Sequence, residues 1–251
     1  SPSFKIFMRH LMHTQVAILG AGPAGLFLSH LLHLQGIDSI VIESRSRDYV
    51  EGRLRAGVLE KGTVDALVES GVGERLLREG LRHSGINFRF GGRTQPLDIR
   101  GLAGDKHVTV YGQQEVVKDL IAARLAAGGK ILFNVEAKEI IGVDTPAPRV
   151  RIVSEGVEQE ISCGLVAGCD GFHGISRPPI PADIRKTFDR VYPFSWLGIL
   201  ADVPPPSNCP LVFDWAPGSH RAGRPLAQGS QCPHIGTKEN TTRSPARANS
   251  P

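Results

Sequence analysis

A glycine-rich segment near the start of the chain, Gly20-Ala-Gly22-Pro-Ala-Gly25, constrains the fold more than any other feature. It follows a short apolar run, Gln15–Leu19, and precedes a stretch up to His33 whose apolar residues predict a helix. In such a strand–turn–helix, the first glycine permits the tight turn and the second allows a pyrophosphate to approach the backbone. The third allows the helix to pack closely on the strand. Glycines also form turns that bind no ligand. The elements on either side of this segment therefore decide whether it is a nucleotide-binding turn or only a structural one.

The flanking elements favour nucleotide binding. A second apolar run, Ser39–Glu43, predicts another strand and ends in an acid 18 residues after Gly25. A carboxylate near this spacing accepts hydrogen bonds from a ribose in dinucleotide-binding folds. The N-terminus of the intervening helix would offer free N–H groups and a positive dipole end to phosphates. The sequence therefore predicts a doubly wound α/β domain that binds a dinucleotide.

Size and charge exclude other classes of function. The chain has 251 residues, enough for one or two domains, and no apolar run is long enough to span a membrane. The net charge of +4 arises in residues 1–11 and 213–251, whereas residues 12–212 carry a net charge of −1. A basic face for nucleic acid is therefore not expected, and an adaptor that binds nucleic acid through its tail is disfavoured. Residues 1–11 lack the features of a secretory signal and are interpreted as an N-terminal extension.

The cysteine pattern indicates reduced thiols. No two cysteines have C-x-x-C spacing, which argues against a zinc site and against a disulfide reductase on the same fold. We expect a cytoplasmic protein without a metal site. The four cysteines are Cys163, Cys169, Cys209 and Cys232.

The rest of the chain alternates between helical and extended patterns. A polar connection at 44–52 precedes a helical pattern, and a Gly-rich link joins two alternating runs that predict a hairpin. This order predicts an α/β domain from which a second sheet grows. The expected helices are 58–69, 73–78 and 114–127, and the expected strands are 86–90, 94–99, 107–111, 130–133, 136–143, 149–153, 157–163 and 165–169.

A second informative stretch runs from Cys169 to Arg177 and contains Asp170-Gly-Phe-His173. A carboxylate and a glycine at the end of a buried strand lie where a doubly wound sheet binds ligands, and Asp170 could bond a ribose or ribityl hydroxyl. The alternative is an Asx-type turn in which Asp170 only ends the strand.

These motifs occur together in one order, along with Arg53-x-Arg55-Ala-Gly57 and Tyr111-Gly-Gln113. In this combination the chain resembles the 4-hydroxybenzoate 3-monooxygenase family of class A flavoprotein aromatic hydroxylases, over residues 12–207. The resemblance implies FAD and NADPH as cofactors, O₂ as a co-substrate, and hydroxylation of 4-hydroxybenzoate to 3,4-dihydroxybenzoate. It also implies a homodimer for the full-length family. The flavin carries the hard chemistry, and the protein supplies binding, orientation and electrostatics.

The resemblance implies roles for individual residues. Gly20, Gly22 and Gly25 would hold the FAD pyrophosphate, and Glu43 would hold the adenosine ribose. Further contacts to FAD would come from Arg55, Gln113 and Asp170, and contacts to NADPH from Arg45, Tyr49, Arg53 and His173. His83 matches the solvent end of a proton path from the phenol. Arg55 could instead be a solvated surface residue, and His83 a packed side chain.

The resemblance also implies the domain organisation. A Rossmann-like FAD-binding domain would comprise 12–83 and 102–188, and an incomplete antiparallel-sheet substrate domain would comprise 84–101 and 189–207. Residues 208–251 have no sustained period and are rich in Pro, Gly, Ser, Thr and Arg, so we expect a disordered or unrelated tail. The family pattern continues well beyond 207 and includes a phenol-activating tyrosine that has no match here. Two alternatives stay open: an active hydroxylase by descent, or an inactive truncated FAD-binding remnant that lacks half of the substrate site.

Overall fold

The computed structural model describes residues 12–55, 57–90, 93–104 and 106–192, together with the backbones of two later strands. The described residues fall into two compact units. The larger contains 12–84 and 99–192, and the smaller contains 85–98 and the two later strands. The expected N-terminal extension, most of the 189–207 segment and the cysteines at 209 and 232 lie outside the described residues.

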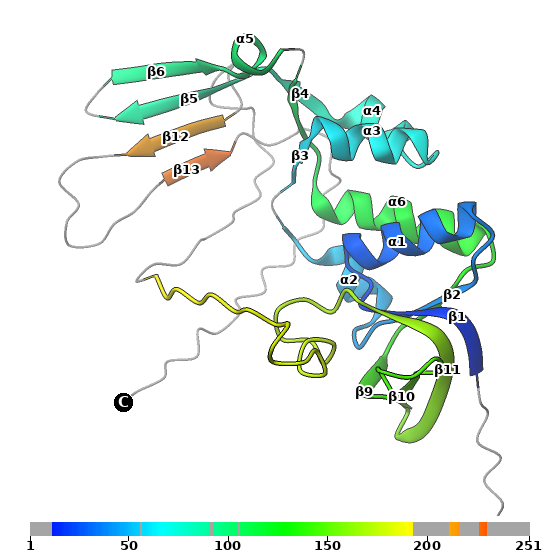
Figure 1. Ribbon diagram of the computed structural model, residues 1–251. Helices are drawn as coiled ribbons and strands as arrows, with labels where there is room; N and C mark the ends of the chain where they lie inside the picture. The colour runs from blue at the N-terminus through cyan, green and yellow to red at the C-terminus, as the bar shows by residue number, and fades with distance from the viewer. Residues whose placement is uncertain are drawn as a thin grey trace, which may run out of the picture. The chain divides into compact units, whose positions relative to one another are not determined.

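The larger unit is built on a six-stranded sheet with β1 near its middle (Figure 1). Strands β8, β2, β1 and β11 run parallel to one another, and β10 and β9 extend the sheet in antiparallel fashion. The carboxyl ends of β2, β1 and β11 therefore share one edge of the sheet. In spatial order the strands are β8 (Lys130–Leu132), β2 (Ser39–Ile42), β1 (Met12–Leu19), β11 (Val157–Gly168), β10 (Arg149–Ser154) and β9 (Val135–Ile141).

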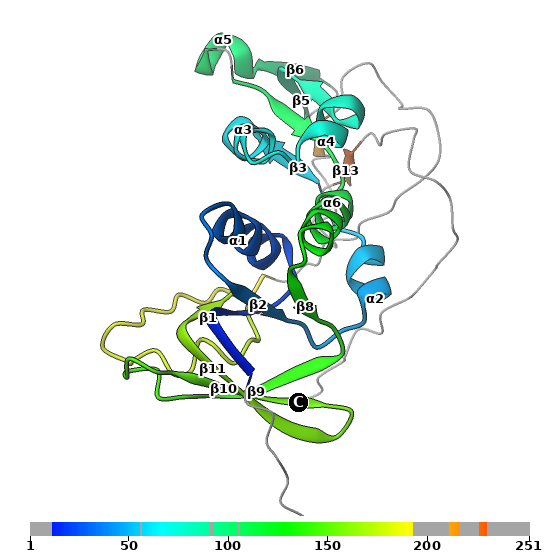
Figure 2. The same ribbon diagram turned by 90° about the vertical axis from the view of Figure 1, so that its right-hand side faces the viewer.

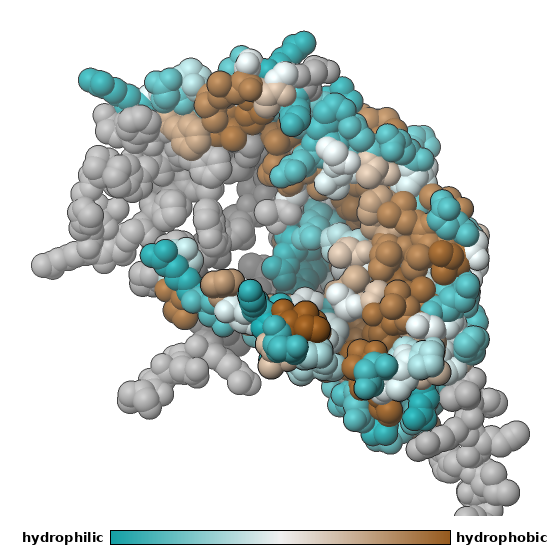
Figure 3. Space-filling model, viewed as in Figure 1, coloured by the Kyte–Doolittle hydropathy of each residue, from teal (hydrophilic) through white to brown (hydrophobic). Residues whose placement is uncertain are grey.

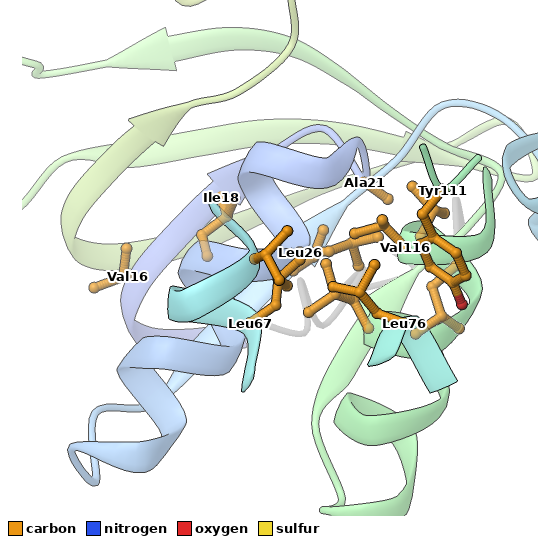
Figure 4. Packing of buried hydrophobic residues seen from close by; sticks show 13 residues of the cluster. Val16, Ile18, Ala21, Leu26, Leu67, Leu76, Tyr111 and Val116 are labelled. Carbon is orange, nitrogen blue, oxygen red and sulfur yellow. The ribbon is translucent and has the colours of Figure 1, made fainter. Parts of the chain in front are cut away.

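Strand β1 is buried on both faces, as its apolar run predicts. Val16 and Ile18 belong to a cluster on one face, and Ala17 and Leu19 belong to a cluster on the other. Helices α1 (Pro23–Leu34) and α6 (Gln113–Ala126) lie side by side on the first face (Figures 1 and 2). In Figure 4, Leu26 of α1 points into the middle of the first cluster.

A three-stranded sheet and four short helices complete the larger unit. Strand β7 lies between β3 and β4 and pairs with both in antiparallel fashion. These strands are β3 (Val58–Glu60), β7 (Val108–Val110) and β4 (Leu81–His83), and the helices are α2 (Arg47–Gly52), α3 (Lys61–Glu69), α4 (Glu74–Glu79) and α5 (Ile99–Ala103).

Local structure differs from the sequence prediction in several places, and strand β4 and helix α5 had no predicted counterpart. Residues 58–60, expected to be helical, form β3, because pairing with β7 outweighs their helical pattern. The polar connection at 44–52 contains α2, whose N-cap Ser46 accepts a hydrogen bond on Oγ from the Tyr49 N–H at 3.2 Å. The two strands expected at 157–163 and 165–169 form one strand, β11, which pairs with β10 and with β1. Leu165 in this strand was predicted to be buried, but it is 59% exposed.

The smaller unit contains the predicted hairpin. Strands β5 (Gly85–Phe90) and β6 (Arg93–Asp98) pair in antiparallel fashion. Two strands from the 208–251 region extend this sheet: β12 (Leu211–Trp215) pairs in parallel with β5, and β13 (Leu226–Gly229) pairs with β12. Strands of four or five residues are too short to show a period in sequence. The remainder of the expected tail lies outside the described residues.

The surface of the larger unit is mixed in character. Figure 3 shows hydrophobic side chains reaching the surface over the outer face of α1, where Leu31 and Leu34 are exposed. The apolar stripe of α1 is thus wider than the face that the core covers. Within the described part of the chain, no helix combines the length and the hydropathy that crossing a membrane requires.

Candidate functional site

The glycine turn at the carboxyl end of β1 needs glycine for steric reasons at two positions. Gly20 has a φ of 101°, and a Cβ there would overlap the carbonyl of Cys169 at the end of β11. A Cβ on Gly25 would overlap the Gly20 carbonyl and crowd Ile18, so this glycine lets α1 start close to β1. At Gly22, the N-cap of α1, a Cβ would meet no atom within 4 Å, so the space beside this residue is open.

Glu43, directly after β2, is tied to this turn. Its Oε2 accepts a hydrogen bond from the Ala21 N–H at 2.9 Å, and its Oε1 accepts one from the Arg45 N–H at 2.9 Å. The carboxylate therefore holds the end of β2 against the glycine turn. A carboxylate offers about four acceptor positions, so it retains capacity for the hydroxyls of a ligand.

Asp170 lies two residues past the end of β11, beside the glycine turn. Its Oδ2 accepts a hydrogen bond from the Ser176 N–H at 3.0 Å, and its Oδ1 accepts one from the Ser176 hydroxyl. Gly174 lies against the carboxylate, because a Cβ there would overlap it. These bonds close a loop to Ser176, six residues on, whereas an Asx-type turn would bond the N–H two residues on. Asp170 also lies in the groove described next, which is compatible with a ligand contact.

Two pockets open along this edge of the sheet. Their volumes are about 450 and 480 Å³, and both are lined by Gly20, Glu43 and Asp170, which makes them one continuous groove. The first extends over the N-termini of α1 and α6, and the second extends over the start of β9. Ten of the twelve residues singled out from the sequence line the groove: Gly20, Gly22, Glu43, Arg45, Tyr49, Arg53, Arg55, Gln113 and Asp170 in the first pocket, and His173 in the second.

One wall of the first pocket carries three arginines. The guanidinium groups of Arg45 and Arg53 lie over the Tyr49 ring, at 5.2 Å and 5.9 Å from its centroid. Arg55 lines the same pocket. These cations, together with the positive end of the α1 dipole, make the pocket suitable for an anionic ligand.

The other two predicted residues lie away from the groove lining. Gly25 is behind the turn, where it contributes packing. His83 is at the end of β4, paired with β7, and does not line either pocket. Burial lowers the pKa of His83, and its Nε2 is buried without a hydrogen-bond partner in the described part of the chain. The imidazole is therefore favoured in its neutral form.

Sequence reasoning missed a polar network under the N-terminal half of α6. Arg75 forms ion pairs with Glu115 at 2.6 Å and with Asp119 at 2.8 Å, and Asp119 also accepts a hydrogen bond from the Tyr111 hydroxyl at 2.7 Å. Burial would raise the pKa of Glu115, but hydrogen bonds from Lys118 and Arg75 outweigh it, so the pKa lies below its usual value. Burial raises the pKa of Tyr111, as does its bond to Asp119. The spacing of Glu115 and Asp119, four residues apart on α6, did not predict their ion pairs with Arg75, because Arg75 lies on another helix, α4.

The groove fits a dinucleotide. It has an open backbone approach at Gly22, a carboxylate at each of two strand ends, and cations along one wall. Among the described residues, no group of three or more His, Cys, Asp or Glu side chains is placed to hold a metal ion. The groove thus has the features of a nucleotide site, and the described residues show no metal centre.

Comparison with known proteins agrees with this geometry. Residues 13–245 match a family described as an FAD binding domain. The chain is 48% identical to p-hydroxybenzoate hydroxylase from Acinetobacter baylyi over 194 residues, which cover 77% of this chain and 48% of that protein. It is 29% identical over 160 residues to 12-dehydrotetracycline 5-monooxygenase/anhydrotetracycline 6-monooxygenase from Streptomyces rimosus, covering 64% of this chain and 31% of that protein. The chain spans about half the length, or less, of these relatives.

Solved structures show the same fold. The p-nitrophenol 4-monooxygenase PnpA from Pseudomonas putida superposes with a TM-score of 0.60 at 23% identity, over 72% of this chain and 46% of that one. PqsL from Pseudomonas aeruginosa gives a TM-score of 0.62 at 19% identity, over 72% and 48% of the two chains. The match covers residues 13–245, which is most of the chain, and the chain therefore belongs to the FAD binding domain family.

Proposed function

We propose that this chain forms the nucleotide-binding part of an FAD- and NADPH-dependent aromatic hydroxylase that acts on 4-hydroxybenzoate. The observation that carries the proposal is the convergence of the glycine turn, Glu43 and Asp170 on one groove. The similarity to p-hydroxybenzoate hydroxylase supports the choice of substrate. Because the chain spans about half of that protein, hydroxylation is proposed for a polypeptide that also has the remainder of the substrate site.

In this proposal, different residues of the groove contact different parts of FAD. The open backbone at Gly22 and the N-terminus of α1 accept the diphosphate, Glu43 accepts hydrogen bonds from the adenosine ribose, and Asp170 contacts the ribityl chain. Arg55 and Gln113 add contacts to the same molecule. The chemistry that FAD would supply there is two-electron transfer from NADPH to O₂, so that one atom of O₂ enters the ring and the other leaves as water.

The cationic wall of the first pocket is the proposed docking site for NADPH. Arg45 and Arg53 lie over the Tyr49 ring and present positive charge to the groove, and His173 lines the second pocket together with Arg45. A guanidinium can bind a phosphate through two parallel hydrogen bonds, which suits the 2′-phosphate that distinguishes NADPH from NADH.

His83 is proposed to pass a proton between the substrate phenol and solvent. Its neutral imidazole can both accept and donate a proton, and its buried Nε2 has no hydrogen-bond partner in the described residues. A proton acceptor kept neutral by burial is suited to receive the phenolic proton.

Two measurements test the proposal. Titration of the purified chain with FAD, followed by quenching of flavin fluorescence, should give saturable binding of one FAD per chain. NADPH oxidation that depends on 4-hydroxybenzoate should then be measured in a polypeptide that also has the remainder of the substrate site, with benzoate, which lacks the phenol, as the control. Binding of FAD without turnover would support an inactive remnant, and failure to bind FAD would refute the proposal.

A further inference from the structure

Gln114 is a buried polar residue that no sequence motif singled out. It is the second residue of α6, it lines the first pocket, and it is only 4% exposed. Its Oε1 is buried and has no hydrogen-bond partner among the described residues. A buried acceptor without a donor destabilises the folded chain, so its presence at a pocket wall requires an explanation.

The residue at the N-cap of α6 makes room for this amide. A Cβ on Gly112 would lie 2.6–2.9 Å from the amide atoms of Gln114, which is too close. Gly112 has φ of −53° and ψ of 133°, angles that an alanine also adopts. The backbone therefore does not require glycine here, and what the missing Cβ provides is space for the Gln114 amide.

The N-terminus of α6 is also held in place and left uncapped. The Tyr111 hydroxyl bonds Asp119 of α6 at 2.7 Å, and Arg75 pairs with both Asp119 and Glu115 of the same helix. No side chain caps α6, and the Gly112 carbonyl accepts hydrogen bonds from the N–H groups of Glu115, at 2.9 Å, and Val116, at 3.3 Å. The Gln114 amide is thus a polar group at a rigid corner of the pocket.

We propose that the Gln114 carboxamide is a further cofactor contact, which accepts a hydrogen bond from a hydroxyl of the ribityl chain of FAD. This inference rests on the proposed function. The missing partner of Oε1 is a donor, and the donors of FAD near a diphosphate are the hydroxyls of the ribose and of the ribityl chain. Glu43 is assigned to the ribose, which leaves the ribityl chain for Gln114. Because Oε1 is buried in the cofactor-free chain, this contact requires the amide to rotate until its oxygen faces the pocket.

Two variants of the 251-residue chain test the inference. Gln114→Met keeps the length of the side chain and removes the amide, and Gly112→Ala keeps the amide and displaces it. In both, the Kd for FAD should rise about tenfold, which corresponds to the loss of one hydrogen bond, while the Kd for ADP should not change. Gln35→Met, a matched change at an exposed glutamine that caps the far end of α1, should leave both constants unchanged.

Thermal unfolding without cofactor separates binding from a structural role. Gln114→Met replaces an unpartnered buried amide with an apolar side chain, so its Tm should be equal to or above that of the wild type. A lower Tm together with an unchanged Kd for FAD would overturn the inference, and so would an equal loss of affinity for FAD and ADP. If the wild-type chain binds ADP but not FAD, or neither, the proposed function itself fails.

Discussion

Two glycines in the same turn should respond to alanine in opposite ways. At Gly25 a Cβ would overlap the Gly20 carbonyl, a backbone atom that cannot move cheaply, and would lie 3.1 Å from the Ile18 side chain. At Gly22 a Cβ would meet no atom within 4 Å, and the backbone angles there, φ −75° and ψ 176°, suit alanine. Gly25→Ala should therefore damage the fold, and Gly22→Ala should damage only the binding of a ligand.

The magnitudes follow from these contacts. Overpacking against a backbone atom costs about 3 kcal/mol, the upper end of its range, and the higher helix propensity of alanine returns up to about 1 kcal/mol, so Gly25→Ala should lose about 2–3 kcal/mol of unfolding free energy. Gly22→Ala should change the unfolding free energy little, because the gain of about 0.4–1 kcal/mol from lower freedom in the unfolded chain is offset by the poorer fit of alanine at an N-cap. Its methyl would keep a diphosphate from the backbone and remove at least one charge-assisted hydrogen bond, which raises the Kd for FAD about tenfold to hundredfold.

Urea unfolding and fluorescence titration with FAD measure the two effects separately. Gly25→Ala should have the lower free energy of unfolding of the two variants. Gly22→Ala should be the more stable variant and should bind FAD weakly. A Gly22→Ala variant that unfolds as easily as Gly25→Ala, or that binds FAD like the wild type, would refute the reasoning.

Three further predictions follow from the described contacts. Glu43→Gln replaces one carboxylate oxygen with an amide N–H₂ group, which faces the N–H of Ala21 or of Arg45 and cannot accept its hydrogen bond. The unfolding free energy should therefore fall by about 1–2 kcal/mol, and the affinity for FAD should fall about tenfold. Wild-type values in both assays would exclude these contacts. Arg75→Met should lower unfolding free energy by about 2–3 kcal/mol, because buried Glu115 keeps only Lys118 as a cation and Asp119 loses its ion pair with Arg75. Since the pKa of Glu115 is depressed in the folded state, this difference should be full above the pKa of an unfolded glutamate and shrink as the pH falls through the folded pKa; a difference that grows on acidification would contradict the pairing. Because burial lowers the pKa of His83, NMR titration of its ring should give a midpoint below 6.5, and a midpoint at or above 6.5 would show that the ring is not desolvated.

The sequence predicted the parts of the fold that depend on short-range patterns and on parallel strand ends. The apolar runs of β1 and β2 and the glycine turn place Gly20 and Glu43 at one edge of the sheet, as expected for a parallel pair. Asp170 reaches the same edge because β11 pairs in parallel with β1, with Gly168 opposite Leu19. That pairing is long-range, and only the resemblance to a known family pointed to it.

The missed features depend on contacts that a sequence pattern does not encode. Nothing in residues 157–168 shows that one strand continues through Gly164, because the pairing partner changes from β10 to β1 along its length. The network of Arg75 joins two helices across 40 and 44 residues. In the sequence, Gln114 is only a polar residue at the start of an amphipathic helix. Its burial, and the space that the missing Cβ of Gly112 leaves for its amide, are visible only in the structure.

Hydrogen exchange with and without FAD tests most directly whether the two turns bind one molecule. Addition of FAD should slow amide exchange in both the 20–25 segment and the 169–176 segment, with half-saturation at the same FAD concentration. ADP should protect the first segment more than the second, because the ribityl chain is assigned to Asp170. Protection of only one segment by FAD, or of the two at different concentrations, would contradict a single groove that binds one flavin nucleotide.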